Sequence, residues 1–250
     1  MKFPDFIIAG FGRCGTSAIL LNLGQHPDIQ IALRPGTEIK FWGTPDFKDN
    51  IDQYKNRFNG KICGEKSPGY ILHRKIIENI IGYIPNVKII LCMRNPVYRA
   101  VSHVELHKRW GRVKQDKQIN MTEFGKVHRE GQYIIYIKQH ILPFFPKENV
   151  YYNIMEWSKE NFDEHISKIH NFLGADPRKT EIENTFIEDK FNNESPYTQL
   201  FKDNKNHHVW THSYYTEPTE DYLIKAHKYF EPFNDELFEF LGYDIPEWRM

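Results

Sequence analysis

The sequence predicts an α/β protein in which a parallel sheet is flanked by helices on both faces. Short apolar runs bounded by glycine or charged residues alternate along the chain with segments of helical periodicity. A glycine-rich turn of the P-loop type joins the first apolar run to the first helical segment. A chain of 250 residues is long enough for one well-buried domain, so we expect residues 1–250 to form a single domain.

The amino-acid composition indicates which binding partners and which cell compartment to expect for this protein. Lys and Arg together number 33, as do Asp and Glu, so no overall charge favours nucleic acid or an anionic membrane. No apolar run approaches the roughly 18 residues of a membrane span. Cys14, Cys63 and Cys92 are odd in number and lie in apolar or glycine-rich surroundings, which favours small buried side chains in a reducing compartment. We therefore expect a cytoplasmic protein with no nucleic-acid partner and no stable membrane insertion.

The first part of the chain carries three predicted strands. Phe6–Gly10 is fully apolar and bounded by glycine, as expected for a strand buried on both faces, and the helix of Ala18–Leu23 follows it. The extended runs Ile29–Leu33 and Lys61–Gly64 lead into the polar loops RPGTEIKFWG and EKSPGY. Because ligands of open α/β sheets bind at the carboxyl ends of the strands, we expect both loops at the site.

The strongest helix and strand patterns come next. A periodic segment, Arg74–Tyr83, precedes the apolar strand Val87–Met93. Asn95 is the predicted cap of the helix Val97–Arg109, because the proline after it favours the first helical turn.

Predicted helices and strands alternate less regularly in the rest of the chain. Residues 122–141 are moderately periodic and predict one helix, and Val150–Ile154 predicts a strand. Residues 158–174 predict a helix between a serine cap and a glycine stop. Periodicity is lost over 177–218, which predicts a long loop, and the closing segment predicts a helix pair broken at Pro232.

The glycine-rich turn differs from the P-loop of nucleoside triphosphatases at its lysine position. Counting the pattern GxxxxGK[ST] from Gly10 puts Thr16 where lysine belongs. Backbone N–H groups at a helix N-terminus still favour an anion, Thr16 and Ser17 add hydroxyl donors, and Arg13 adds a charge. The missing lysine, and the lack of an aspartate at the end of the fourth predicted strand, argue against an ATP and magnesium enzyme.

A second anion-binding pattern lies in RNPVYRAVSH. Arg94 stands at a strand end and Ser102 stands eight residues later, about two helical turns on, so both can face one side of the anion site. Arg94 offers a planar fork for a phosphate, and Ser102 offers a hydroxyl donor. The alternative is that Arg94 pairs with a carboxylate and that Ser102 is incidental.

These residues carry a family resemblance. The chain resembles sulfotransferases that use 3′-phosphoadenosine 5′-phosphosulfate (PAPS), within them the glycan-modifying group with heparan sulfate sulfotransferases and bacterial relatives. IIAGFGRCGTSAILLNLGQHPDI resembles the 5′-phosphosulfate loop, and IILCMRNPVYRAVSHV resembles the 3′-phosphate motif RxPxxRxxSxY, whose last position is Val104 here. TEIKFW, EKSPGY and FEPFNDELFEFLGYDIPEW add support.

The resemblance implies the sulfotransferase fold, PAPS as cofactor, its product PAP, and no required metal. The 5′-phosphosulfate would lie on the glycine-rich turn, and the 3′-phosphate on the second pattern. The lysines of the region 177–218 stand where the family often has a basic loop that closes over the nucleotide. The implied cofactor-binding residues are Gly12, Arg13, Cys14, Gly15, Thr16, Ser17, Arg94, Ser102, Lys202 and Lys205.

The resemblance also implies catalytic roles. Glu38 in TEIKFW would remove the proton of an acceptor hydroxyl or amine, and Arg13 and Lys66 would stabilise charge on the transferring group. The acceptor would be a carbohydrate or glycan, contacted by Lys40, Trp42 and Lys66. Two alternatives stay open: a P-loop kinase that phosphorylates a small molecule with ATP and magnesium, and a non-catalytic module that binds a nucleotide or a glycan.

Overall fold

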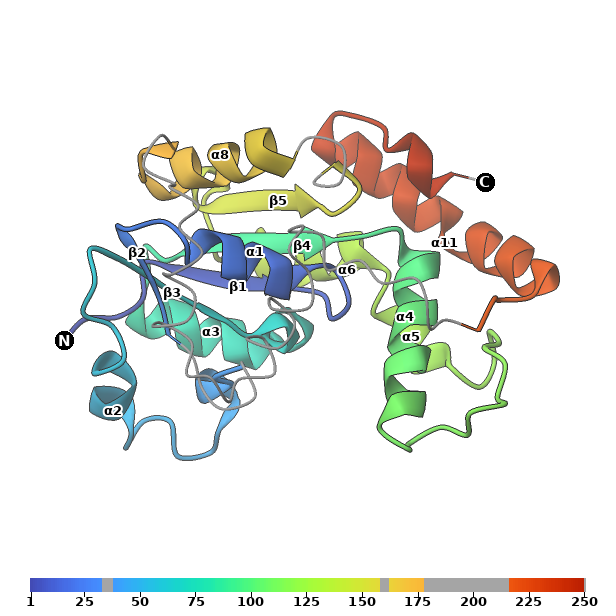
Figure 1. The fold of residues 1–250 in the computed structure, drawn as a ribbon, viewed down its shortest axis with the longest axis horizontal. Coiled ribbons are helices and arrows are strands. Elements are labelled where there is room, and N and C mark those ends of the chain that lie inside the picture. The colour runs from blue at the N-terminus through green and yellow to red at the C-terminus, as the bar shows by residue number, and fades with distance from the viewer. Residues whose placement is uncertain (33–37, 158–161, 178–215, 250) are drawn as a thin grey trace.

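A parallel sheet forms the centre of the computed structural model, which describes residues 1–32, 38–157, 162–177 and 216–249 (Figure 1). The strand order is β2-β3-β1-β4-β5, and all four pairings are parallel. The strands are β1 (Phe6–Gly10), β2 (Ile29–Ile31), β3 (Ile62–Lys66), β4 (Lys88–Met93) and β5 (Val150–Ile154). The predicted α/β fold is confirmed.

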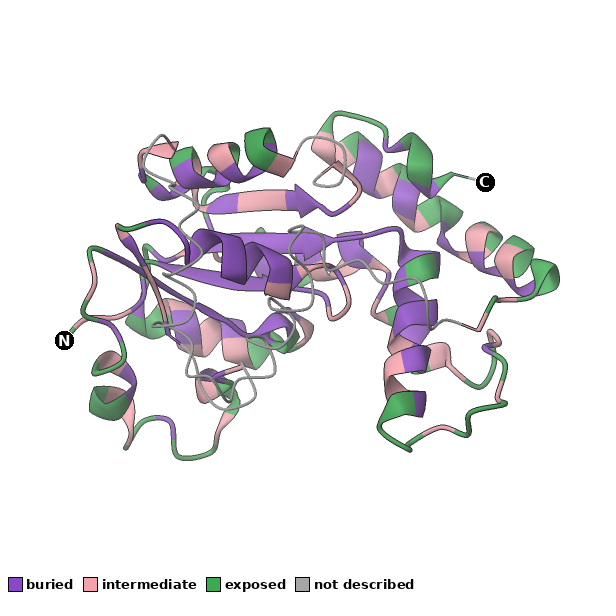
Figure 2. Ribbon diagram, viewed as in Figure 1, coloured by how far each residue is buried: buried purple, intermediate pink, exposed green. Residues whose placement is uncertain are grey.

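Burial explains why the strand sequences do not alternate between apolar and polar residues. Every residue of β1 and β3 is buried, and so is every residue of β4 after Lys88 (Figure 2). Strands covered on both faces need apolar side chains at every position. Polar residues at the ends of such strands, among them Glu65 and Lys66, are therefore exceptions that need partners.

Helices pack around this sheet. Contacts join α1 to α8, α3 to residues 137–141, and α4 to both α5 and α11. In Figure 1, α4 leaves the carboxyl end of β4 and points away from the sheet. The helices are α1 (Thr16–Leu23), α2 (Ile51–Lys55), α3 (Arg74–Tyr83), α4 (Pro96–Arg109), α5 (Gly125–Arg129), α6 (Tyr133–Tyr136), α8 (Phe162–Leu173) and α11 (Glu220–Leu241).

The start of α4 has the predicted cap. The Asn95 side-chain oxygen accepts hydrogen bonds from the backbone N–H groups of Val97 and Tyr98, at 3.0 and 3.4 Å. Pro96 occupies the first helical position, where its missing N–H is not needed. The cap fixes the direction in which α4 leaves β4.

The single helix predicted over 122–141 is wrong. The chain forms α5, turns near Gly131, and resumes as α6, which continues into a π-helical turn over Ile137–Ile141. A Cβ atom at position 131 would lie 2.8 Å from the ring of Phe230 on α11. Close packing of α11 against a position without a side chain thus interrupts the helix.

The predicted break at Pro232 is also wrong, because α11 runs unbroken through it. Proline removes one helical hydrogen bond, but tertiary packing supplies most of the stability of helices in proteins. Both halves of α11 bury side chains that provide this packing: Tyr222, Ala226, Phe230, Leu237 and Phe238. The serine cap at 158 and most of the loop predicted over 177–218 lie outside the described residues.

Candidate active site

The turn between β1 and α1 presents the N-terminus of a helix at the carboxyl edge of the sheet. Gly10 has a φ of 118°, and a Cβ there would lie 2.4 Å from the backbone nitrogen of Cys92, so only glycine fits this close approach to β4. Gly15, with a φ of 77°, is the N-cap of α1, and its carbonyl accepts from the N–H of Ile19. The first N–H groups of a helix lack acceptors within the helix, so this end attracts an anion.

The side chains of the turn point in two directions. Arg13 donates from Nε to the hydroxyl of Ser102 on α4, at 2.9 Å. The thiol of Cys14 is fully buried, 3.7 Å from the hydroxyl of Tyr133, and burial raises the pKa of Cys14 to about 11. Only the backbone of Cys14 can therefore face a ligand. The hydrogen bond between Arg13 and Ser102 joins two β-α units at one place.

Arg94 is a buried cation at the end of β4. The residue is 6% exposed, and its carbonyl accepts from the hydroxyl of Tyr133 at 2.7 Å. Its guanidinium forms no hydrogen bond or ion pair with any residue in the described part of the chain. No carboxylate among the described residues pairs with this guanidinium. The alternative that Arg94 forms a structural ion pair is therefore not supported. A buried guanidinium of this kind is well suited to an anionic ligand.

Lys66 connects the glycine-rich turn to the predicted base. Its side chain is 3% exposed at the end of β3, and Nζ donates to the hydroxyl of Ser17 at 3.1 Å. The same Nζ lies 3.9 Å from Oε1 of Glu38, whose Oε2 lies 3.1 Å from Nζ of Lys40. Glu38 is 31% exposed and Lys40 is 69% exposed, so the carboxylate stands between a buried and an accessible ammonium group.

Glu65, the residue before Lys66, is a buried carboxyl group within β3. It accepts hydrogen bonds from the hydroxyls of Tyr54, Ser67 and Tyr70, at 2.6, 2.9 and 3.5 Å. Burial raises the pKa of Glu65 to about 7, and the three hydrogen bonds oppose that rise. The predicted strand ended at Gly64, whereas β3 continues through Glu65 and Lys66, so only the structure shows that this carboxyl group is buried.

The predicted contact of Trp42 with an acceptor sugar is wrong. Trp42 is 1% exposed, and its indole N–H donates to the hydroxyl of Tyr54 at 3.1 Å. Its ring packs against those of Phe41, Phe47 and Tyr83. This aromatic cluster buries more apolar surface than an exposed indole could, so Trp42 belongs to the core.

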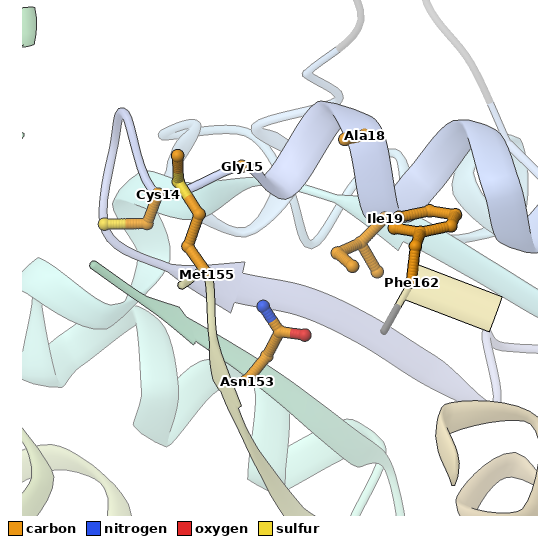
Figure 3. Close-up of a pocket in the computed structure, with 7 residues that line it drawn as sticks. All are labelled: Cys14, Gly15, Ala18, Ile19, Asn153, Met155 and Phe162. Atoms are coloured by element: carbon orange, nitrogen blue, oxygen red, sulfur yellow. The ribbon is translucent and has the colours of Figure 1, made fainter. Parts of the chain in front are cut away.

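A small, mostly apolar hollow lies beside the turn. Figure 3 shows Asn153 and Met155 of the β5 segment below the start of α1, with Cys14 and Phe162 at the sides. The amide oxygen of Asn153 is hydrogen-bonded to Nε2 of His165. Burial lowers the pKa of His165 to about 4, so the imidazole is neutral at pH 7. The hollow thus forms a fixed, uncharged wall next to the anion-binding turn.

Further observations concern metal ligands, membrane-spanning helices, the cysteines and two lysines. No group of His, Cys, Asp or Glu suited to a metal ion occurs within the ranges that the structure describes. None of the helices described there is long and apolar enough to cross a membrane. All three cysteines are buried and unpaired, as predicted. Lys202 and Lys205 lie outside the described residues.

Comparison with known proteins identifies the family. A family model described as "Sulfotransferase domain" matches residues 3–241. The chain is 27% identical over 137 residues to the membrane-associated sulfotransferase kil1 of Dictyostelium discoideum, a match to 52% of this chain and 29% of that protein. It is 32% identical over 105 residues to human heparan sulfate glucosamine 3-O-sulfotransferase 6, a match to 40% of this chain and 30% of the relative. The chain thus covers under a third of these relatives' length.

A solved structure supports the fold independently. The sulfotransferase from Alicyclobacillus acidocaldarius superposes over 100% of both chains, with a TM-score of 0.75 and 21% sequence identity. At that identity the likeness shows the fold alone. The two chains therefore share the same overall fold.

Proposed function

This chain belongs to the sulfotransferase family, and on that premise we propose that it transfers a sulfuryl group from PAPS to a hydroxyl or amine of a carbohydrate acceptor. The carbohydrate part of the proposal rests on the heparan sulfate relatives. Assignment of residues 1–250 to one sulfotransferase domain belongs to the same proposal. The cytoplasmic location stays a prediction, and the kinase alternative loses its basis with the family match.

The observation that carries the proposal is the position of Lys66. Its ammonium group is hydrogen-bonded to Ser17 of the anion-binding turn and lies 3.9 Å from the carboxylate of Glu38. A group held by the turn would therefore stand beside both a cation and a candidate base. General-base catalysis requires this proximity, because the base must reach the acceptor proton as the acceptor attacks.

The residues of the turn, together with Arg94 and Ser102, fit a nucleotide that has an anionic group at each of two positions. The start of α1 with Thr16 and Ser17 would hold the 5′-phosphosulfate, and Arg94 with Ser102 would hold the 3′-phosphate. Arg13, which lies between the two through its hydrogen bond to Ser102, would neutralise both. Arginine stays protonated in proteins, so Arg13 would stabilise charge without donating a proton.

PAPS supplies an activated sulfuryl group, and the chain's residues would do the rest. Glu38 would take the proton of the acceptor O–H or N–H while the new bond to sulfur forms. As the bond from sulfur to the bridging phosphate oxygen breaks, Lys66 would stabilise the charge on the sulfuryl oxygens, and Arg13 would stabilise the negative charge on the departing phosphate. Orientation and charge neutralisation would thus account for most of the rate enhancement.

Thermal unfolding with adenosine 3′,5′-bisphosphate in EDTA, set beside ATP with magnesium, tests the cofactor. A ligand at 100 times its dissociation constant stabilises a protein by about 2.7 kcal/mol. For a chain of this size we expect a rise in Tm of about 5 to 11 °C with the bisphosphate alone. A rise in Tm that occurs only with ATP and magnesium would contradict the proposal and favour the kinase alternative.

An acceptor screen tests the reaction itself. Incubation with PAPS labelled in its sulfate, and with desulfated heparan sulfate fragments as acceptors, should transfer label to the fragments. The non-catalytic alternative predicts binding of the bisphosphate with no labelled product from any carbohydrate offered.

A further inference from the structure

The three hydroxyl groups around Glu65 share a second property. Each accepts a hydrogen bond from the short segment that follows Glu38. Ser67 accepts from the backbone N–H of Lys40 at 3.0 Å, and Tyr70 accepts from the backbone N–H of Trp42 at 3.3 Å. Tyr54 accepts from the indole N–H of Trp42 at 3.1 Å. One carboxylate on β3 therefore anchors residues 40–42 through three separate hydroxyls.

We propose that Glu65 is a positioning residue that holds Glu38 and Lys40 beside the anion-binding turn. The inference rests on the proposed role of Glu38 and adds a residue that touches neither cofactor nor acceptor. Glu65 acts through Ser67, Tyr54 and Tyr70, which transmit its position to the segment 40–42.

The direction of the hydrogen bonds explains why a carboxylate suits this position. An ionised carboxyl group only accepts hydrogen bonds, so each hydroxyl must donate its proton to Glu65. The oxygen lone pairs of all three hydroxyls then remain for the N–H groups of Lys40 and Trp42. An amide in place of Glu65 would present N–H donors to Ser67, leaving the Ser67 proton without this acceptor.

Backbone strain shows that the segment needs such an anchor. Lys40 has a φ of 52°, in the left-handed region that residues other than glycine rarely adopt. Conformations of this kind persist only where the surroundings fix them. The bond from the Lys40 N–H to Ser67 is one such constraint, and Glu38 stands two residues before it. Loss of the anchor would relax Lys40 and shift the Glu38 carboxylate relative to Lys66.

Hydrogen exchange tests the anchor without any acceptor. By NMR at pH 8, Glu65→Gln should increase the exchange rates of the Lys40 and Trp42 backbone amides at least 10-fold relative to amides of β1. Glu105→Gln is the matched control, because Glu105 is also buried but pairs with Lys108 on α4. Equal exchange of both amides in the Glu65→Gln and unsubstituted proteins would overturn the proposal.

A second pair of variants tests the anchor even if the Glu65→Gln protein does not fold. Ser67→Ala and Tyr54→Phe each remove one hydroxyl from Glu65. The Ser67 hydroxyl accepts from the backbone N–H of Lys40, whereas the Tyr54 hydroxyl accepts from the indole N–H of Trp42. Ser67→Ala should therefore accelerate exchange of the Lys40 amide, while Tyr54→Phe should leave it near the rate of the unsubstituted protein. The opposite ranking would contradict the anchor.

Kinetics separate positioning from a merely structural role. A displacement of about 1 Å can lower a rate about 100-fold, so Glu65→Gln should lower kcat by this order. Its dissociation constant for adenosine 3′,5′-bisphosphate should change less than twofold, because the turn and Arg94 are untouched. An unchanged kcat would overturn the proposal. Absence of sulfation by the unsubstituted protein would count against the proposed function, while the exchange result would still decide the role of Glu65.

Discussion

Arg13 and Ser102 are 89 residues apart in the sequence, yet their side chains are joined by a hydrogen bond of 2.9 Å. Arg13 belongs to the turn after β1, and Ser102 belongs to α4, which follows β4. Since β1 and β4 are neighbours in the sheet, their carboxyl ends bring both residues to one place. The two motifs singled out in the sequence therefore lie next to each other at the same edge of the sheet.

Ser102→Ala should weaken binding of adenosine 3′,5′-bisphosphate about 10- to 100-fold, because a hydrogen bond to a charged group contributes roughly 1.5 to 3 kcal/mol. Calorimetric titration would measure the change. Ser167→Ala on α8 is the control, since that exposed hydroxyl donates to the carbonyl of Asp163 within the same helix. Affinity equal to that of the unsubstituted protein would exclude Ser102 from the phosphate site.

Arg94→Met should change ligand affinity and stability in opposite directions. Loss of the guanidinium should weaken binding of adenosine 3′,5′-bisphosphate about 100-fold or more. The free energy of unfolding without ligand should rise by about 1 to 3 kcal/mol, because a buried charge with no partner among the described residues is replaced by an apolar chain. Affinity for adenosine 5′-phosphate, which lacks the 3′-phosphate, should stay constant. Equal losses for both nucleotides would contradict the assignment.

Glu38→Gln should lower turnover by about 10² to 10⁴, the range that general-base assistance provides. Its affinity for adenosine 3′,5′-bisphosphate should be unchanged, because Gln keeps the size of the side chain and the phosphate-binding residues remain. Glu78→Gln on α3 is the control, since the ion pairs of Glu78 within the described residues are with Arg74 and Lys75 on that helix. Unchanged turnover in Glu38→Gln would remove Glu38 from the mechanism.

Unfolding experiments between pH 8 and pH 5 should show falling stability as the pH falls. Burial lowers the pKa of four histidines below their usual 6.5: His103 to about 3, and His128, His165 and His170 to about 4 each. Between pH 6.5 and pH 4 the unfolded chain therefore binds more protons than the folded one, so stability rises with pH in this window.

Glu65 acts in the opposite direction in part of the same window. Its raised pKa of about 7 means that the folded state binds more protons than the unfolded one between pH 4.5 and 7, so its contribution falls as the pH rises. Because the pKa values of four histidines shift by amounts similar to the shift of Glu65, their combined effect on stability exceeds that of the one glutamate. Tm should therefore be higher at pH 7.5 than at pH 5, and a flat or inverted profile would contradict the buried, neutral histidines.

Local patterns predicted the parts of the fold whose cause is local. β1 and β4 are continuous apolar runs, α3 has the predicted bounds Arg74–Tyr83, and α4 has the predicted cap. The glycine-rich turn was predictable because glycine at a strand end and hydroxyl residues at a helix start are local signals. The family resemblance then linked this turn to Arg94 and Ser102.

Long-range packing decided what the sequence could not predict. Trp42 is buried because aromatic rings from distant parts of the chain, among them Phe3 and Tyr83, pack around it. The sequence pattern near Trp42 does not indicate these contacts. Glu65 gained its role from hydroxyls on α2 and on the turn directly after β3, and the turn at Gly131 formed through contact with α11. Each outcome depends on which segments meet in space.

The strand order divides the site into two halves with β1 between them. Glu38 and Lys40 follow β2 and Lys66 ends β3, whereas Arg94 and Ser102 follow β4 on the other side. The residues proposed for the acceptor thus lie on one side of β1, those proposed for the 3′-phosphate lie on the other, and the glycine-rich turn after β1 lies between them. Evolution could therefore exchange the loops after β2 and β3 to meet new acceptors while the nucleotide half stayed constant. The fold is modular at the level of single strands.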